Sequence, residues 1–246
     1  MPINATVVSI VLRRLITGRR ALALAILPLL VGGIALAYFA SGERDDPTPA
    51  EIYASLAEQF LLPSAVAFVA VVLGASAIGD ERDDGTILYL AATPLRRVTL
   101  VASSAFAAWI ATTLLSLPGL AATLGFALGS EATVRAALWS LLGLAATTLC
   151  YAALFGWLAL AIRRPVLVGF LYVVLWEGSV AAFAPSARWL SVSAYGRALL
   201  HKGLPAGTDA PTVPAAGAVT ALLVLIAATV VLVVLAARRF PRVELP

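Results

Sequence analysis

Residues 136–162 read AALWSLLGLAATTLCYAALFGWLALAI, and they contain no charged side chain. A helix that crosses the hydrocarbon core of a bilayer needs about 20 predominantly apolar residues. Only helices and closed barrels satisfy every backbone hydrogen bond in lipid, and barrel strands alternate polar and apolar residues over about 10 positions. This stretch is too long and too uniformly apolar for such a strand, so we expect a transmembrane helix.

Further stretches of the chain have the same character, and they cover residues 21–40, 60–79, 98–129, 165–184 and 213–237. The stretch 98–129 is long enough for one tilted span but not for two, and the stretch 165–184 is interrupted only by Glu177. We therefore expect an all-α integral membrane protein with six transmembrane helices, organised as a single domain over residues 1–246.

The composition excludes the common soluble classes. Of the 246 residues, 61% are hydrophobic and 12% are charged, and the mean hydropathy is +0.98. Soluble domains have roughly 45–50% apolar and about 25% charged residues, and disordered chains are less apolar still. Cys150 is the only cysteine and cannot form an internal disulfide. The net charge of +4 comes from short basic clusters between apolar stretches, which argues against a nucleic-acid partner.

The distribution of basic residues predicts the orientation. With a cytoplasmic N-terminus, twelve of the 17 Lys and Arg residues fall on the inside, in agreement with the positive-inside rule. Both termini are then cytoplasmic, and the first outer loop is acidic and includes Glu58. A signal peptide is the alternative interpretation of residues 1–40, but its apolar core would be only about 7–15 residues long. We expect a multi-pass protein of the cell (plasma) membrane.

Two segments outside the spans have helical periodicity. Residues 1–20 carry apolar side chains on one side and arginines on the other, which is typical of an amphipathic helix in the membrane interface. A plain basic flank of the first span is the alternative. Between the fifth and sixth spans, Trp189, Val192, Tyr195 and Leu199 recur at helical spacing. They predict an outer helix that lies at the interface or re-enters the membrane, with an aromatic belt as the alternative.

Residues 79–97, GDERDDGTILYLAATPLRR, connect the second and third spans. Four acids precede a short apolar segment, which ends before Pro94 because proline disfavours helix in the preceding residue. A two-turn apolar helix on the cytoplasmic side would leave residues 87–90 against water. We expect this helix to dock onto another protein or to lie on the lipid surface; a solvated turn with a charge cluster is the alternative.

Most catalytic chemistry is absent from the sequence. His201 and Cys150 are the only residues of their types, so the chain cannot build a metal site from clustered His and Cys ligands. There is no G-x-S-x-G elbow and no G-x-x-x-x-G-K-[ST] motif, and the only lysine, Lys202, lies in the outer segment. We expect no enzymatic activity, no cofactor and no metal in this chain, and we expect His201 to be a surface residue.

Glu177 is the only ionisable residue well inside a predicted span. It lies roughly 18 Å along the helix from Pro165, which places it at the bilayer midplane or in the outer half. Carboxylates are costly in the membrane and mark functional sites by default. Two interpretations are open: Glu177 lines a pathway or braces an outer gate near Trp176 and Trp189, or it lies in the wetter outer half and pairs with Arg188.

The segment 79–97 resembles the corresponding region of permease subunits of ATP-binding-cassette transporters of the type-2 exporter family. Those subunits carry a charged cluster after the second span, then Gly-Thr, an apolar stretch, a proline and arginines. The matching residues are Glu81, Arg82, Asp83, Asp84, Gly85, Thr86, Leu88, Tyr89, Pro94, Arg96 and Arg97. The order of segments also matches: an amphipathic N-terminal helix, six spans, and outer helices between the last two spans.

The resemblance implies a half-transporter without its own ATPase. Two permease chains, identical or paralogous, would form the substrate path, and two copies of a separate ABC ATPase would bind ATP and Mg. Each ATPase would receive residues 84–93 as a coupling helix, with Arg163 and Arg164 as a second contact. Independently, the apolar interior favours a hydrophobic or amphipathic substrate, such as a lipid or drug. The alternatives are an ATP-independent carrier that uses Glu177 and a membrane anchor that recruits a cytoplasmic partner.

Overall fold

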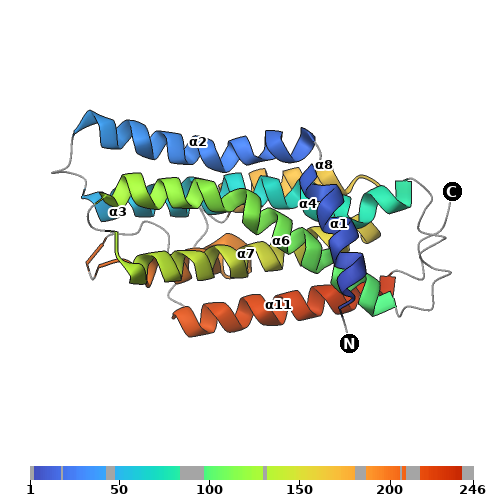
Figure 1. Ribbon diagram of the computed structural model, residues 1–246. Coiled ribbons are helices and arrows are strands. Elements are labelled where there is room, and N and C mark those ends of the chain that lie inside the picture. Colours follow the sequence, from blue (N-terminus) through green and yellow to red (C-terminus); the bar gives the residue numbers. More distant parts are fainter. Residues whose placement is uncertain are drawn as a thin grey trace.

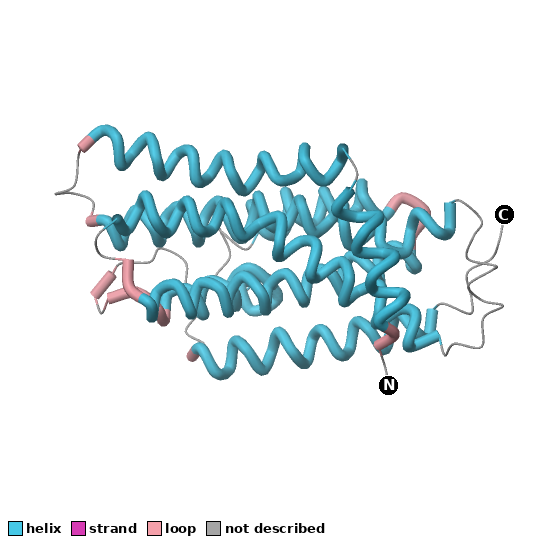
Figure 2. Tube along the Cα trace, in the orientation of Figure 1, coloured by secondary structure: helices cyan, strands magenta, loops and turns pink. Residues whose placement is uncertain are grey.

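A computed structural model describes residues 3–17, 19–42, 48–83, 97–129, 132–180, 187–205, 207–208 and 217–239. Within these ranges the chain is helical and has no strand. The long helices run side by side in one bundle, and the first helix and the last residues of the final helix lie at the same end of it (Figures 1 and 2). The all-α prediction is therefore confirmed for the described part of the chain.

Five of the described helices are long and apolar enough to cross a membrane. They are α2 (Arg19–Ser41); a continuous helix formed by α3 (Pro49–Ser55), the π-helical η1 (Leu56–Val66) and α4 (Ala67–Asp83); α6 (Arg97–Thr123) with the π-helical η2 (Leu124–Leu128); α7 (Val134–Ala161); and α11 (Ala218–Arg239). They correspond to five of the six predicted spans.

The stretch predicted as the fifth span, residues 165–184, forms a shorter helix. It consists of α8 (Pro165–Leu171) and the π-helical η4 (Tyr172–Val180). At 1.5 Å per residue these two elements extend about 24 Å, less than the roughly 30 Å of a hydrocarbon core. Residues 181–184 lie outside the described ranges, so a sixth crossing at this place stays a prediction.

The N-terminal amphipathic helix is confirmed as α1 (Ala5–Thr17). Val11 and Leu15 are buried on its apolar side, and Arg14 is exposed on the other. The Arg14 guanidinium donates a hydrogen bond of 3.0 Å to the carbonyl oxygen of Ser76, near the end of α4. This contact fixes α1 across one end of the bundle (Figure 1).

The centre of the bundle is α7, which packs against α4, α6, α11 and the short helix α10 (Val192–His201). Small residues permit this close packing. A Cβ atom added at Gly143 of α7 would lie 2.5 Å from Leu200 of α10, and one added at Gly74 of α4 would lie 3.0 Å from Phe155 of α7. By contrast, α2 and α11 are largely exposed, as expected for helices that face lipid or another subunit.

The second long helix begins at Pro49 rather than at residue 60, which corrects the sequence prediction. Thr48 caps its start: its hydroxyl accepts a hydrogen bond from the backbone N–H of Glu51, and the Glu51 carboxylate accepts one from the Thr48 N–H. This reciprocal pair is a capping box. Glu58 consequently lies inside a helix of the bundle, and its assignment to an acidic outer loop was wrong.

Candidate functional site

Two buried glutamates lie around the helix α10. Glu177 of η4 is 2% exposed, and Glu58 of η1 is 0% exposed. All residues of α10 from Ser193 to Leu200 are buried, and the helix contacts α7, α11 and η1. The helix predicted between the last two spans is therefore present, and the bundle encloses it rather than leaving it on the surface.

The Glu177 carboxylate holds the start of α10. Its Oε2 accepts hydrogen bonds of 2.5 Å from the hydroxyls of both Ser191 and Ser193. Its Oε1 accepts bonds from the Tyr172 hydroxyl at 2.9 Å and from the backbone N–H groups of Val192 at 3.0 Å and Ser193 at 3.4 Å. A carboxylate at a helix N-terminus satisfies amides that have no partner within the helix and is favoured by the helix dipole.

A buried arginine belongs to the same network. Arg197 is 6% exposed, and its Nη2 donates a hydrogen bond of 2.8 Å to the Ser193 hydroxyl, which in turn donates to Glu177. Ser193 thus connects a buried cation to a buried anion. Buried charges are costly unless they are paired and hydrogen-bonded, and this arrangement meets that requirement within the chain.

The second glutamate contacts the other end of α10. The Nδ1 of His201 lies 3.3 Å from the Oε1 of Glu58, and the His201 side chain is 29% exposed. Beyond this contact, the Glu58 carboxylate accepts no hydrogen bond from the described residues. His201, expected to be a surface residue, is thus partly exposed, and its imidazole faces a buried carboxylate.

The Glu58–His201 contact predicts that the packing of α10 weakens as pH rises. This contact raises the pKa of His201 above its ordinary value of about 6.5, although partial burial opposes the shift. A group with a raised pKa in the folded state contributes stability below its unfolded pKa and loses it as pH rises through the folded pKa. We expect a higher thermal unfolding temperature at a pH of about 6 than at about 8.

The control for this pH effect is His201→Asn, which keeps a polar side chain but does not titrate. Its unfolding temperature should lose the part of the pH dependence that the wild type shows between about 6 and 8. Arg197, four residues earlier on α10, also interacts electrostatically with Glu58. Its guanidinium group does not titrate between a pH of about 6 and 8, so it does not contribute to this pH dependence. An identical pH profile in the variant and the wild type would contradict the assignment.

Sequence reasoning found Glu177 but missed its partners and the Glu58–His201 contact. Two signals were present. Ser191 has the residue type of a helix N-cap, and its hydroxyl accepts from the Ala194 N–H. Arg197 and His201 are four residues apart and share one side of the helix.

The two tryptophans predicted near Glu177 lie in the described part of the chain. Trp176 is half-buried, and Trp189 is 52% exposed, with its carbonyl oxygen accepting a 2.7 Å hydrogen bond from the Tyr195 hydroxyl.

The predicted coupling region is described only at its two ends. Glu81, Arg82 and Asp83 form the last turn of α4, and Arg97 begins α6. The remaining predicted residues lie outside the described ranges; they are Asp84, Gly85, Thr86, Leu88, Tyr89, Pro94 and Arg96. The coupling helix at 84–93 therefore stays a prediction.

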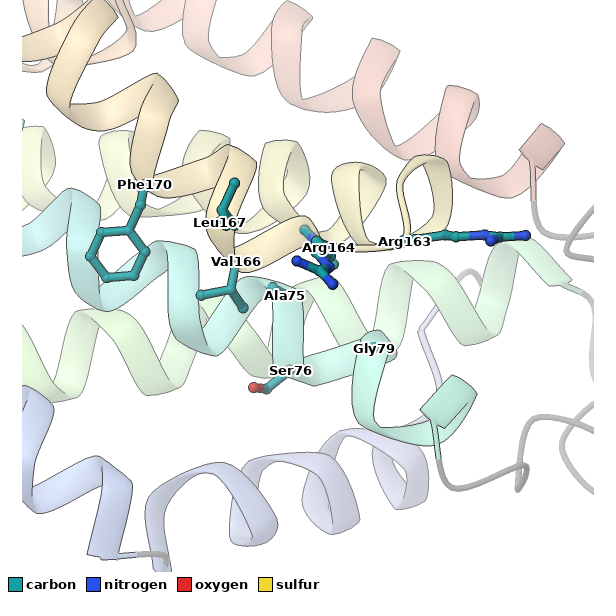
Figure 3. A pocket seen from close by; sticks show the side chains of 9 residues that line it. Ala75, Ser76, Gly79, Arg163, Arg164, Val166, Leu167 and Phe170 are labelled. Atoms are coloured by element: carbon teal, nitrogen blue, oxygen red, sulfur yellow. The ribbon is translucent and has the colours of Figure 1, made fainter. Parts of the chain in front are cut away.

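Arg163 and Arg164 form the turn between α7 and α8, and both are exposed. They border a cavity of about 590 Å³ between this turn and the last part of α4 (Figure 3). The turn and the end of α4 are thus neighbours. Among the described residues, no three His, Cys, Asp or Glu side chains come together as metal ligands.

Comparison with known proteins identifies a family. A family model described as "ABC-2 family transporter protein" matches residues 18–184, which extend from the start of α2 past η4. The matched part is more than half of the chain and includes both the predicted coupling segment and Glu177. A search of curated proteins finds no match.

Proposed function

Because the chain belongs to the ABC-2 family of transporter membrane proteins, we propose that it is the membrane-spanning subunit of an ATP-driven exporter and works with a separate ATPase. The family match over residues 18–184 carries this proposal. The chain itself has no P-loop motif, and its only lysine, Lys202, is followed by Gly203. In the proposal, two copies of an ATPase subunit bind ATP and Mg²⁺, and two permease chains form the substrate path.

The segments that we propose to contact the ATPase lie at one end of the bundle. The helix α1, the end of α4, the start of α6, the turn at residues 162–164 and the end of α11 all lie at one end (Figure 1). Arg13, Arg14, Arg163, Arg164, Arg238 and Arg239 are exposed there. Under the positive-inside rule this end would be cytoplasmic, and residues 80–97 would face the ATPase. The 163–164 turn lies beside the described end of α4.

In this proposal, the outer gate lies in the half of the bundle opposite the end that contacts the ATPase. We place α8 and η4 as a sixth crossing completed by residues 181–184, and we assign Glu177 to bracing α10 on the outer side. Glu177 accepts hydrogen bonds from the Ser191 and Ser193 hydroxyls and from two backbone N–H groups at the start of α10, which supports a bracing role over an ion pathway. The apolar interior suits a hydrophobic or amphipathic substrate, such as a lipid or a drug.

The test of this function is a charge exchange in the coupling region. Glu81→Lys combined with Arg82→Glu keeps the net charge but reverses both signs at the end of α4. We expect the double variant to stay in the membrane, to lose most of the co-purifying ATPase and to lose ATP-dependent transport. The measurement is ATPase retained per permease after affinity purification.

The matched control is Arg44→Glu with Asp45→Lys, the same kind of exchange in the connection between α2 and α3. The end of α2 and the start of α3 lie at the other end of the bundle (Figure 1). This control should retain the ATPase. If the exchange at residues 81 and 82 leaves ATPase binding and transport intact, the coupling assignment is wrong. If both exchanges release the ATPase equally, the binding site is not at the α4 end.

A further inference from the structure

The cavity between α4 and α8 has an apolar wall and a basic rim. It is lined by Ala75, Ser76, Gly79, Arg163, Arg164, Pro165, Val166, Leu167 and Phe170. In Figure 3, Phe170, Leu167 and Val166 line one side, Arg164 lies beside Ala75, and Arg163 extends away from Phe170. None of the lining residues that the structure describes is acidic.

The shape of the cavity follows from residue size along the two helices. Farther from the turn, α8 touches α4 closely: a Cβ atom at Gly169 would lie 2.8 Å from Val71, and the Phe68 and Phe170 rings stack at 5.0 Å. Nearer the turn, the described α4 residues that line the cavity are the small residues Ala75, Ser76 and Gly79. The space opens where these small side chains leave the α8 wall uncovered.

The contact between α1 and the cavity wall indicates at which depth of the membrane to expect the cavity. Ser76, one of its lining residues, accepts the hydrogen bond from Arg14 of α1 through its carbonyl oxygen. An amphipathic helix with buried apolar side chains and exposed arginines lies at the boundary between head groups and acyl chains. We therefore expect the rim arginines to lie at the depth of phospholipid phosphates and the apolar wall to extend toward the hydrocarbon core.

We propose that this cavity binds one anionic phospholipid. The phosphate would pair with Arg164, because guanidinium groups bind phosphate oxygens in a planar, bidentate geometry. Arg163, which extends away from the wall (Figure 3), would add positive charge at the rim. An acyl chain would lie along Val166, Leu167 and Phe170, which are 38%, 53% and 40% exposed. Basic pockets between transmembrane helices on the cytoplasmic side recognise anionic head groups in this way.

Lipid retention by the permease alone tests the site, without ATPase or transport. The protein is purified from vesicles of equal parts phosphatidylglycerol and phosphatidylcholine, and the retained lipid is counted by native mass spectrometry. We expect one phosphatidylglycerol to be retained in preference to phosphatidylcholine. Arg163→Ala with Arg164→Ala should lower that preference about tenfold or more, and Arg163→Lys with Arg164→Lys should largely keep it.

Two further variants separate this site from general attraction. Arg238→Ala with Arg239→Ala removes the same charge from the last turn of α11 and should leave retention unchanged. Val166→Trp fills the cavity beside intact arginines and should abolish retention. The proposal is overturned if no preference exists, if both arginine pairs lower retention equally, if Val166→Trp has no effect, or if inorganic phosphate takes the place of the lipid.

Discussion

Replacing Glu177 with alanine should release the start of α10 from the bundle. The change leaves the Ser191, Ser193 and Tyr172 hydroxyls and two backbone N–H groups without their acceptor, and it removes one of the anions that interact with the buried Arg197. Removing one member of a buried charge network costs about 3–5 kcal/mol. The expected results are a large fall in the thermal unfolding temperature and exposure of α10.

Cysteine labelling measures that exposure directly. Cys150 is buried, so the native protein gives little background with a maleimide. A cysteine introduced by Ala194→Cys, at a position 1% exposed, should react slowly in the wild-type background and much faster with Glu177→Ala. The control is Glu51→Ala, which removes a glutamate from an exposed helix cap and should cost only about 1 kcal/mol. Equal labelling with both substitutions would exclude a brace at Glu177.

The second large effect is expected at Gly119, where α2 and α6 cross. A Cβ atom at this position would lie 2.4 Å from the carbonyl carbon and oxygen of Pro28. Because the obstacle is backbone, no side-chain rotation can relieve it, and the two helices must move apart. Gly119→Ala should therefore destabilise the protein by about 3 kcal/mol or more, at the upper end of the range for overpacking. The measurement is the thermal unfolding temperature, which should fall.

The matched control for Gly119 is Gly125→Ala in η2, the continuation of the same helix. No atom lies within 4 Å of a Cβ placed there, and alanine is the better helix former. Gly125→Ala should be neutral or slightly stabilising. A Gly119→Ala protein as stable as this control would show that α2 does not pack against α6 as described.

The transmembrane helices were the most predictable part of the fold. A bilayer imposes length and apolarity on any helix that crosses it. The helix at residues 136–162 could therefore be predicted from its own sequence, without knowing which helices pack against it. Boundaries were less predictable, because a helix can continue past its apolar stretch where a cap supports it. Thr48 and Glu51 do so for the second long helix, although their capping-box pattern was visible in the sequence.

The polar centre was only partly predictable because it depends on packing between distant segments. The cost of a carboxylate in an apolar stretch singled out Glu177. Nothing local showed that Glu58 would meet His201, because that contact requires α10 to enter the bundle between α7, α11 and η1. The coupling residues were predicted from the resemblance of residues 79–97, and their role is a proposal.

The central claim is that this chain transports only together with a separate ATPase. The most direct measurement is to co-express it with the reading frames on either side of its gene, purify it in mild detergent and assay the complex for ATP hydrolysis. The account predicts that a Walker-type ATPase subunit co-purifies with the permease in equal amounts. A permease that purifies alone, and moves substrate in response to an ion gradient without any nucleotide-hydrolysing partner, would contradict it.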